Sequence, residues 1–186
     1  MLVLLDRDGV INKDLPNSVT SLDDFQLLPG VGRSIACLNK AKIKVAVVTN
    51  QACVGRGDLS AEGLESIHQK MQQLLKKDNA YIDKIYVCTD TKILPNNRRK
   101  PAPGMILEAM QDFNTIPRNT VMIGDADRDL EAATAAGCHK ILVLTGKGKL
   151  TYDTIKSNDC SLIVHKNLPS AIDFLLTTPL ENSGRL

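Results

Sequence analysis

Short runs of apolar residues, with no polar residues alternating between them, recur along this chain of 186 residues. Runs of this kind are typical of strands buried on both faces, as in the middle of a parallel sheet. They predict five or six strands, at 1–5, 45–48, 82–87, 120–123, 140–144 and, as a short sixth, 161–164.

Between these runs, apolar residues recur at helical spacing. They predict helices at about 31–42, 61–77, 104–113, 128–136 and 168–176. Ser60 is suited to cap the second helix and Gly137 to end the fourth, whereas the glycine-rich stretch 53–58 is interpreted as a loop. Strands that alternate with helices predict a Rossmann-like three-layer α/β sandwich, in which helices cover both faces of a parallel sheet of five or six strands.

The chain shows no internal repeat, low-complexity tract or linker. Residues 9–44 and 52–98 separate the polar ends of the predicted strands, and one helix, one strand and loops account for each segment. A second domain therefore has no segment from which to form. We expect residues 1–186 to be a single domain without a cap domain, with a functional site that is open to solvent.

The composition indicates which classes of binding partner and which cellular compartment to expect. The net charge is only +2, aromatic residues make up 3% of the chain and tryptophan is absent, which argues against nucleic-acid binding. The five cysteines include no C-x-x-C pair, and the N-terminal apolar run stops at Asp6 with no basic segment before it. We expect reduced thiols, a cytoplasmic protein without a membrane partner, and a monomer or small homo-oligomer.

Two carboxylates, Asp6 and Asp8, follow the first strand directly. Open α/β sheets bind ligands at the carboxyl ends of their strands. Because residues i and i+2 of an extended segment point the same way, both carboxylates can face one phosphorus atom while Arg7 points elsewhere. A carboxylate can attack phosphorus while a second group protonates the leaving oxygen, which overcomes the slow hydrolysis of phosphate monoesters. The alternative interpretation is an acidic surface turn.

Asp125 and Asp129 indicate a metal site. Asp125 follows Gly124 at the end of the fourth strand, and Asp129 lies one turn into the next helix. Mg²⁺ prefers one or two carboxylates together with water and phosphate oxygens, and several carboxylates beside a phosphate repel one another unless a cation is present. The alternative, capping of a helix N-terminus by acidic residues, explains Asp127 and stays open for Asp129.

Polar residues at two further positions are suited to hold phosphate. Thr49 and Asn50 end the second strand, where a hydroxyl, an amide and backbone N–H groups could bind phosphate oxygens. Three cations, 98–100, precede Pro101; a lysine suits one phosphate, and an arginine can bind a second one through two hydrogen bonds. The alternatives are a strand-ending turn and a solvated basic loop. The scattered histidines are interpreted as structural or solvent-exposed: His68, His139 and His165.

Together these pieces resemble the haloacid dehalogenase superfamily of phosphatases over nearly the whole chain. Its motifs occur in order: D-x-D-G-[TV] at 6–10, a threonine after an apolar strand at Thr49, a lysine before proline at Lys100, and G-D-x-x-x-D at 124–129. Further segments resemble the cap-less heptose bisphosphate phosphatases, which are close relatives of the histidinol-phosphate phosphatases: 6–12, 29–31, 49–57, 99–101 and 145–148.

The resemblance implies Mg²⁺-dependent hydrolysis of a small phosphorylated metabolite, D-glycero-D-manno-heptose 1,7-bisphosphate, through an aspartyl phosphate. It implies that Asp6 is the nucleophile and Asp8 the general acid and base. The implied Mg²⁺ ligands are Asp6, the backbone carbonyl of Asp8, and Asp125. Asp129 is a candidate for contacts with these ligands rather than with the ion itself. The implied phosphate contacts are Thr49, Asn50 and Lys100 on the transferred phosphate and Arg99 on the substrate's other phosphate.

The segment before Arg99 departs from the pattern of this branch. Many members hold a structural zinc ion through C-x-H followed by C-x-C, but here Cys88 is accompanied by Asp90, Asn96 and Arg98 at the other three positions. One thiolate cannot make a closed tetrahedral zinc site, so we expect no zinc. The change bears on the identity of the substrate more than on the chemistry.

Other functions stay open. Histidinol phosphate is the nearest alternative substrate. A nucleic-acid 3′-phosphatase shares the Thr-Asn-Gln segment at 49–51 and also lacks a cap, but the Asp-Arg-Asp-Gly start, low charge and few aromatic residues count against it. A non-catalytic phosphate-binding protein could have the same fold, although binding alone would not require a free nucleophile beside the other motif residues.

Overall fold

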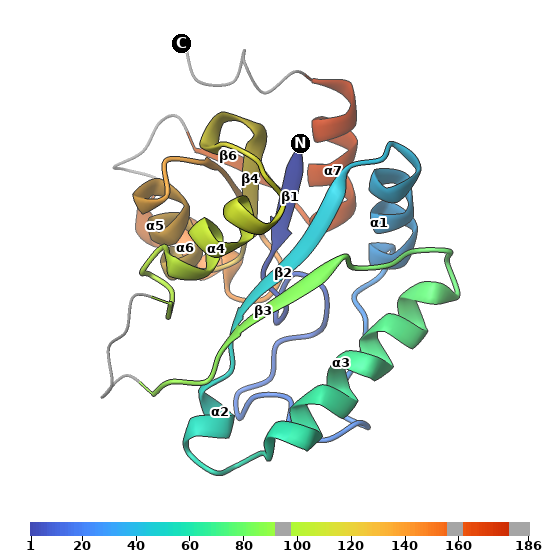
Figure 1. The fold of residues 1–186 in the computed structure, drawn as a ribbon, viewed down its shortest axis with the longest axis vertical. Coiled ribbons are helices and arrows are strands. Elements are labelled where there is room, and N and C mark those ends of the chain that lie inside the picture. Colours follow the sequence, from blue (N-terminus) through green and yellow to red (C-terminus); the bar gives the residue numbers. More distant parts are fainter. Residues whose placement is uncertain (92–97, 156–161, 179–186) are drawn as a thin grey trace.

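The computed structural model describes residues 1–91, 98–155 and 162–178, and Figure 1 labels its elements. Within these ranges, six parallel strands form one sheet in the order β3-β2-β1-β4-β5-β6. Their bounds are Leu2–Leu5 (β1), Lys44–Asn50 (β2), Lys84–Cys88 (β3), Thr120–Gly124 (β4), His139–Val143 (β5) and Ile163–His165 (β6). The predicted parallel sheet is confirmed. β3 begins two residues later than expected, and Ser161 lies outside the described residues.

Helices cover both faces of this sheet (Figure 1). Their bounds are Val31–Lys40 (α1), Ala52–Gly55 (α2), Ala61–Lys76 (α3), Gly104–Asp112 (α4), Asp127–Ala135 (α5), Gly148–Ile155 (α6) and Leu168–Thr177 (α7). Val3 and Leu5 pack with α1, α3 and α7, whereas Leu2 and Leu4 pack with α4 and α5 on the opposite face. Each such side chain contributes about 1.5–3 kcal/mol when it is buried. The three-layer prediction is therefore confirmed.

Two helices lie where the sequence predicted none. α2 is a single turn inside the glycine-rich stretch, and α6 begins at Gly148 after the fifth strand. A Cβ atom at Gly148 would lie 1.8 Å from the Val143 carbonyl oxygen, so the glycine is needed for close packing rather than for a flexible loop. The predicted helix ends are confirmed, because the Ser60 hydroxyl accepts a hydrogen bond from the Gly63 N–H at 3.0 Å and Gly137 has a φ of +70°.

The strand order decides where the polar strand ends meet. β1 lies between β2 and β4, and Leu5 is in register with Val47 on one side and Ile123 on the other. The residues that follow these three strands therefore reach one edge of the sheet. Between β1 and β3 the described residues form only loops and α1, α2 and α3 beside β2, so no cap domain is built from them.

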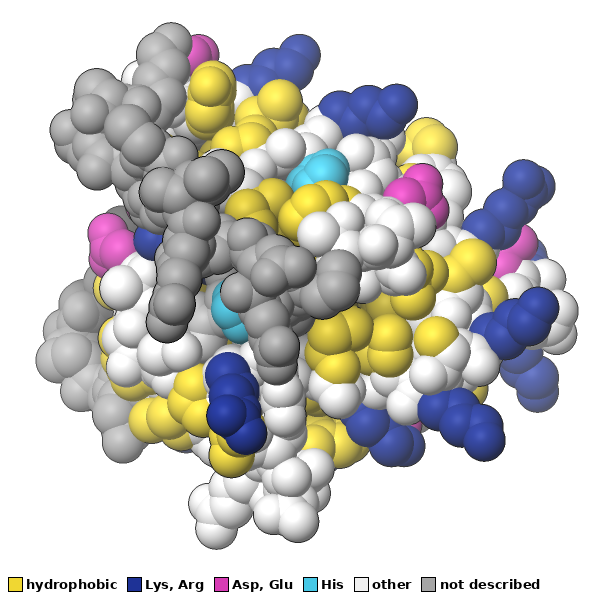
Figure 2. All heavy atoms as spheres, turned by 90° about the horizontal axis from the view of Figure 1, so that it is seen from above, with side chains coloured by type: hydrophobic (Ala, Val, Ile, Leu, Met, Phe, Trp, Pro, Cys, Tyr) yellow, Lys and Arg dark blue, Asp and Glu magenta, His cyan; other side chains and the backbone are white. Residues whose placement is uncertain are grey.

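The opposite end of the sheet, where the strands begin, is seen from above in Figure 2. On this face most of the Lys and Arg side chains lie around the periphery. None of the described helices is long and apolar enough to cross a membrane.

Candidate active site

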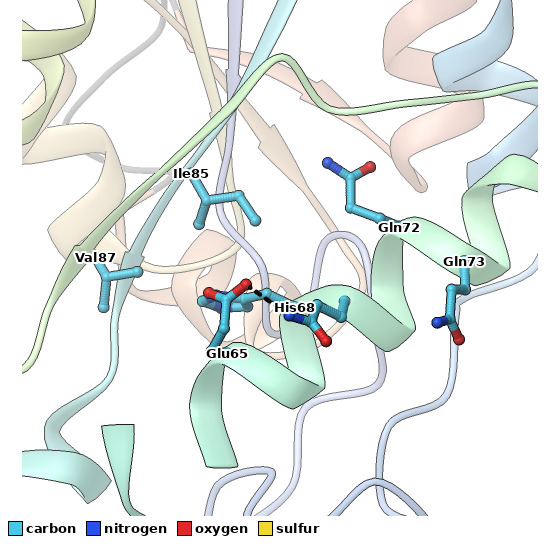
Figure 3. A pocket seen from close by; sticks show the side chains of 7 residues that line it. Glu65, His68, Gln72, Gln73, Ile85 and Val87 are labelled. Atoms are coloured by element: carbon cyan, nitrogen blue, oxygen red, sulfur yellow. Dashed lines mark hydrogen bonds between the residues drawn. The ribbon is translucent and has the colours of Figure 1, made fainter. Parts of the chain in front are cut away.

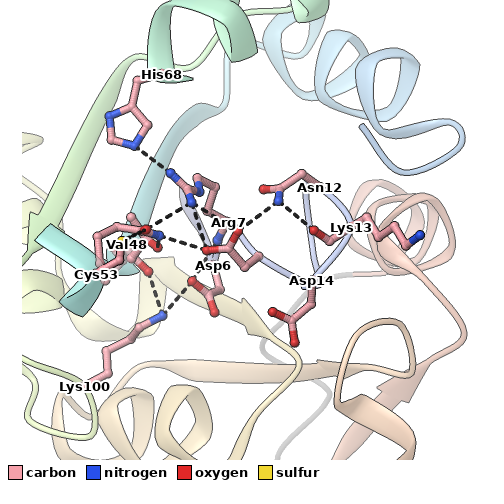
Figure 4. A network of polar contacts seen from close by, with 12 residues as sticks. Asp6, Arg7, Asn12, Lys13, Asp14, Val48, Cys53, His68 and Lys100 are labelled. Atoms are coloured by element: carbon pink, nitrogen blue, oxygen red, sulfur yellow. Dashed lines mark hydrogen bonds and ion pairs between the residues drawn. The ribbon is translucent and has the colours of Figure 1, made fainter. Parts of the chain in front are cut away.

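The predicted site residues Asp6, Thr49 and Asp125 lie at the carboxyl ends of β1, β2 and β4. Figure 4 shows Asp6 beside Lys100 and Arg7. Asp6 follows β1 directly, and its N–H donates to the Ile123 carbonyl of β4 at 3.0 Å. Four charged side chains besides Asp6 are buried at this edge of the sheet: Arg7, Lys100, Asp125 and Asp129. Buried charges need partners, so their arrangement is informative about what the site binds.

Lys100 is the central cation of this group. Its Nζ atom lies near three oxygens: 3.0 Å from Asp6 Oδ1, 2.6 Å from Asp129 Oδ1 and 2.7 Å from the Val48 carbonyl. Burial alone would lower the pKa of Lys100, but the charges of Asp129 and Asp6 raise it above its ordinary value. The lysine is therefore a fixed positive charge beside Asp6.

Asp129 does two things at once. Its Oδ2 accepts hydrogen bonds from the backbone N–H groups of Asp125 and Ala126, at 3.2 and 3.1 Å, while its Oδ1 faces Lys100. A Cβ atom at Gly124 would lie 2.2 Å from Asp129 Cβ, so only glycine leaves room for this side chain. The capping alternative is therefore confirmed for Asp129, and its place behind a metal ion stays a prediction.

The Asp125 carboxylate lies against the backbone of two glycines with positive φ, Gly9 at +84° and Gly146 at +54°. A Cβ atom at either position would lie 2.0–2.1 Å from Asp125 Oδ2. The same oxygen accepts from the Lys147 N–H at 2.8 Å, and Thr145 Oγ1 donates to the Gly9 carbonyl at 2.6 Å. Reasoning from the residues alone missed this contribution of 145–147, although Gly146 was a signal.

Three carboxylates could hold one metal ion: Asp6, Asp125 and Asp129 each offer an oxygen, and these atoms lie within 4.8 Å of one another. Burial, followed by the charge of neighbouring carboxylates, raises the pKa of Asp6 to about 6 and that of Asp125 to about 7. Asp125 Oδ1 is buried and has no hydrogen-bond partner among the described residues. An oxygen-preferring divalent cation such as Mg²⁺ fits this group, since it would satisfy that atom and stabilise the ionised acids.

Arg7 corrects one expectation from the sequence, because its side chain does not point away from the site. Its Nη2 atom donates to both carboxylate oxygens of Asp8, at 3.2 and 3.1 Å. Asn12 Nδ2 and Gln51 Nε2 donate to the same carboxylate at 2.9 and 2.8 Å (Figure 4). Burial alone would raise the pKa of Asp8, but Arg7 and then the two amides lower it below its ordinary value. An extended backbone sets the direction of Cβ, whereas a long side chain can still turn back.

Two polar residues at the end of β2 have different settings. Thr49 is buried, and its Oγ1 accepts from Gln51 Nε2 at 2.9 Å, so the hydroxyl hydrogen remains available for an oxygen of a ligand. Asn50 holds the backbone of Lys100, with Nδ2 donating to the carbonyl at 2.9 Å and Oδ1 accepting from the N–H at 3.1 Å. A contact of Asn50 with phosphate stays a prediction.

Comparisons with known proteins agree with this geometry. A family model for HAD-hydrolase-like proteins matches residues 97–165. A D-glycero-beta-D-manno-heptose-1,7-bisphosphate 7-phosphatase of Neisseria meningitidis is 41% identical over 150 residues, which cover 81% of this chain and 80% of the relative. The chain belongs to the haloacid dehalogenase-like phosphatases. The enzyme of the same name from Bordetella bronchiseptica is 37% identical over 150 residues, 81% of this chain and 84% of that relative.

Solved structures place this haloacid dehalogenase-like phosphatase in the same branch. A D,D-heptose 1,7-bisphosphate phosphatase from B. bronchiseptica, complexed with magnesium and phosphate, matches with a TM-score of 0.90 and 34% identity over 94% of this chain and 97% of that chain. The D,D-heptose 1,7-bisphosphate phosphatase from Burkholderia thailandensis matches with a TM-score of 0.75 and 34% identity, covering 95% and 99% of the two chains. The resemblance expected from the sequence is confirmed.

The segment that departs from the branch's zinc pattern lies beside Arg99 in this phosphatase. Arg99 is half-buried and its Nη1 donates to the Asp90 carbonyl at 2.7 Å. Arg98 pairs with Glu108 and donates to the backbone, while Asn96 lies outside the described residues. Asp90 thus contacts the predicted substrate arginine through its backbone, and the expected absence of zinc stays a prediction.

Two further residues of the phosphatase had no assigned role in the site. Arg128 is half-buried inside the G-D-x-x-x-D segment, and its charge lowers the pKa values of Asp6 and Asp125 against the larger effect of burial. His68 is buried with Nε2 3.3 Å from Arg7 Nη1, so its interpretation as a structural histidine is incomplete. The other two histidines contact residues away from the site: His139 the Arg118 carbonyl, and His165 Ser170 and Phe174.

Proposed function

We propose that this phosphatase hydrolyses D-glycero-D-manno-heptose 1,7-bisphosphate in the presence of Mg²⁺, through an aspartyl phosphate on Asp6. The observation that carries the proposal is the buried Asp6 carboxylate, 3.0 Å from Lys100 and within 4.8 Å of carboxylate oxygens of Asp125 and Asp129. The substrate is proposed because relatives at 41% and 37% identity bear that name, and because a structural neighbour at a TM-score of 0.90 holds magnesium and phosphate.

The proposed reaction has two steps on one nucleophile. In the first, an Asp6 oxygen attacks phosphorus, the bond from phosphorus to the leaving oxygen breaks, and Asp8 gives that oxygen a proton. In the second, water attacks the phosphorus of the aspartyl phosphate and Asp8 accepts the proton of the water. Inorganic phosphate leaves, and the Asp6 carboxylate is restored.

Asp8 can serve in both steps because its surroundings change during the reaction. Without substrate, Arg7 and the two amides hold it as a carboxylate, despite the opposing effect of burial on its pKa. A phosphate dianion adds negative charge nearby and favours the protonated form, which the first step needs. Release of the leaving group and its proton then leaves a carboxylate, which the second step needs.

The positive charge of the site supports the phosphoryl group in both steps. Lys100 is held between Asp6 and Asp129, and we propose that it and the Thr49 hydroxyl contact the transferred phosphate, together with Asn50. Asp6, Asp125 and the backbone carbonyl of Asp8 would hold Mg²⁺, which offsets the negative charge of the carboxylates and of the phosphate when it is bound.

A bisphosphate substrate has a second anionic group to place. We propose that Arg99 binds it, because the guanidinium can form two parallel hydrogen bonds to one phosphate. The Asp90 carbonyl restrains one end of that guanidinium. We further propose that residues 1–186 form one phosphatase domain, which is supported by the single sheet within the described ranges. The cytoplasmic location and the monomeric or small homo-oligomeric state stay predictions.

The test is phosphate release with Mg²⁺ across a substrate panel, with Asp6→Asn as the control variant. The panel holds both anomers of heptose 1,7-bisphosphate, histidinol phosphate, a 3′-phosphorylated oligonucleotide and 4-nitrophenyl phosphate. We expect the fastest hydrolysis for one heptose bisphosphate anomer, with loss of all activity in the control. Preference for histidinol phosphate or the oligonucleotide would overturn the substrate but keep the chemistry. Absence of release from every compound would favour a phosphate-binding protein instead.

A further inference from the structure

Arg7 is a buried cation that has no proposed contact with the substrate. Its side chain is fully buried, whereas the Asp8 side chain that it contacts is 18% exposed. One guanidinium nitrogen, Nη2, donates to Asp8 and also to Gln51 Oε1 at 3.0 Å, and the other, Nη1, lies 3.3 Å from His68 Nε2. The guanidinium thus connects Asp8 to a histidine of α3 (Figure 4).

We propose that Arg7 is a positioning residue that aims the Asp8 carboxylate, and that His68 holds the guanidinium in the orientation this requires. The inference rests on the proposed function, because it concerns Asp8 as the group that protonates the leaving oxygen. Arg7 reaches both carboxylate oxygens from one side, at 3.2 and 3.1 Å, and so limits rotation of the carboxylate. A general acid acts only when its proton lies within hydrogen-bond reach of the leaving oxygen.

His68 is built to accept a hydrogen bond rather than to carry charge. The residue is 5% exposed, and burial together with the nearby charge of Arg7 lowers its pKa to about 4. A neutral imidazole can present the lone pair of Nε2 to the guanidinium N–H. If the acceptor is lost, Nη1 loses this partner, and the described contacts then hold the guanidinium through Nη2 alone, which leaves it freer to tilt relative to Asp8.

His68 is reached from outside through a groove that α3 and β3 line (Figure 3). Gln73 also lines this groove from α3 and is exposed (Figure 3), and it is not among the described hydrogen-bond partners of Arg7 or His68. Substitutions at these two positions of α3 therefore separate an effect on the Arg7 contact from a general effect on the groove.

Substrates with different leaving groups can distinguish a positioning role of Arg7 and His68 from a purely structural role. An alkoxide leaves only with a proton, whereas 4-nitrophenolate leaves with little help, so misdirection of Asp8 should slow the two reactions unequally. General acid catalysis typically contributes about 10²–10⁴-fold. The ratio kcat/KM reports the steps up to loss of the leaving group, and so excludes the later hydrolysis of the aspartyl phosphate.

The experiment compares kcat/KM for heptose 1,7-bisphosphate and for 4-nitrophenyl phosphate, with Mg²⁺, in four variants of the full chain. For heptose 1,7-bisphosphate, we expect kcat/KM to fall about 10-fold in His68→Leu and about 100-fold in Arg7→Gln. For 4-nitrophenyl phosphate, we expect kcat/KM to fall by less than about 3-fold in either variant. His68→Gln, whose amide oxygen can accept from Arg7, should recover most of the loss seen in His68→Leu. Gln73→Leu should match the unmodified protein on both substrates.

Equal losses on both substrates, or no loss in His68→Leu, would overturn the inference. Thermal unfolding checks that each variant folds, and if Arg7→Gln does not fold, the comparison of His68→Leu with His68→Gln decides alone. Absence of Mg²⁺-dependent release by the unmodified protein from either substrate would overturn the proposed function, and this inference with it. If the unmodified protein hydrolyses both substrates but the variants lose activity equally on the two, only the inference about Arg7 and His68 is overturned.

Discussion

The side chain of Asn50 holds the backbone of Lys100 through two hydrogen bonds, 2.9 Å to the carbonyl and 3.1 Å from the N–H. The end of β2 thereby fixes a lysine that lies far along the chain, at the point where its Nζ meets Asp6. Lys100 Nζ adds a second tie to β2 through the Val48 carbonyl, at 2.7 Å. The position of the central cation of the site is therefore a property of two distant segments.

The Asn50→Ala variant should lose activity because Lys100 is no longer held in place. We expect kcat/KM to fall about 10- to 100-fold and the free energy of unfolding to fall by about 1–3 kcal/mol, as measured by enzyme kinetics and urea denaturation. Asn39 offers a matched control, since it makes the same pair of bonds to the backbone of Tyr81 at a distance from the site. Asn39→Ala should destabilise the protein without loss of activity; full activity in Asn50→Ala would contradict the account.

The response of stability to Mg²⁺ should depend on pH. The pKa values of Asp6 and Asp125 are raised from 3.8 to about 6 and about 7, mainly by burial. The metal-free folded protein therefore holds these protons more strongly than the unfolded chain does. The stability that they contribute is complete below about pH 4 and is lost as the pH rises through 6 and 7.

Mg²⁺ requires the ionised carboxylates, so it should raise the melting temperature more at pH 8 than at pH 5. Differential scanning fluorimetry at the two pH values, with and without Mg²⁺, measures this. The Asp125→Asn variant serves as the control, and we expect it to lose most of the Mg²⁺ effect. An equal rise at both pH values would be inconsistent with a carboxylate site.

Gly9→Ala should weaken Mg²⁺ binding, because the new methyl group would overlap with Asp125. Its Cβ atom would lie 2.0 Å from Asp125 Oδ2. We expect the Mg²⁺ concentration that gives half-maximal activity to rise at least about 10-fold, which corresponds to about 1.4 kcal/mol.

Gly137→Ala controls for the backbone strain in this experiment. Gly137 has a φ of +70°, against +84° for Gly9, but a Cβ atom there would meet only Pro117, at 3.8 Å. Backbone strain in the left-handed region should destabilise each variant by about 1 kcal/mol, and Gly9→Ala should lose more stability because its methyl group overlaps with Asp125. A matching Mg²⁺ dependence in the two variants would show that Gly9 does not act through Asp125.

The Arg99→Gln variant should bind the bisphosphate less well. Loss of a charge-assisted contact to the second phosphate predicts a rise in KM of about 10- to 100-fold for heptose 1,7-bisphosphate, with little change for 4-nitrophenyl phosphate. Arg118, which is exposed and contacts His139 through its backbone, provides a control substitution to Gln. If the KM values for both substrates rise together in Arg99→Gln, Arg99 does not bind the second phosphate specifically.

Much of the fold is predictable from the sequence because both faces of the central strands are covered. β1 has no exposed side, so its residues form one apolar run in the sequence. The polar residue that follows such a run marks the end of a strand at the site. α6 was missed for the opposite reason. It has eight residues, begins at a glycine, and among its described residues buries only Gly148 and Thr151, so helical periodicity has little to act on.

The candidate site is predictable as a set of residues but not as a set of contacts. The motif positions place Asp6, Lys100 and Asp125 at one edge, because the strand order brings their segments together. The sequence does not show that Arg7 turns back to Asp8, or that Asn50 is engaged by the Lys100 backbone. Such contacts depend on side-chain torsions and on residues that are distant in the chain.

The most direct test of the central claim is to trap the phosphoryl group on the protein. The enzyme is mixed with Mg²⁺ and heptose 1,7-bisphosphate, quenched with acid within one turnover, and treated with borohydride, which reduces an aspartyl phosphate to homoserine. Mass spectrometry of the peptides then locates the modified residue. The account predicts homoserine at position 6, and none in the Asp6→Asn variant. Full turnover with no reduced residue at position 6 would contradict it.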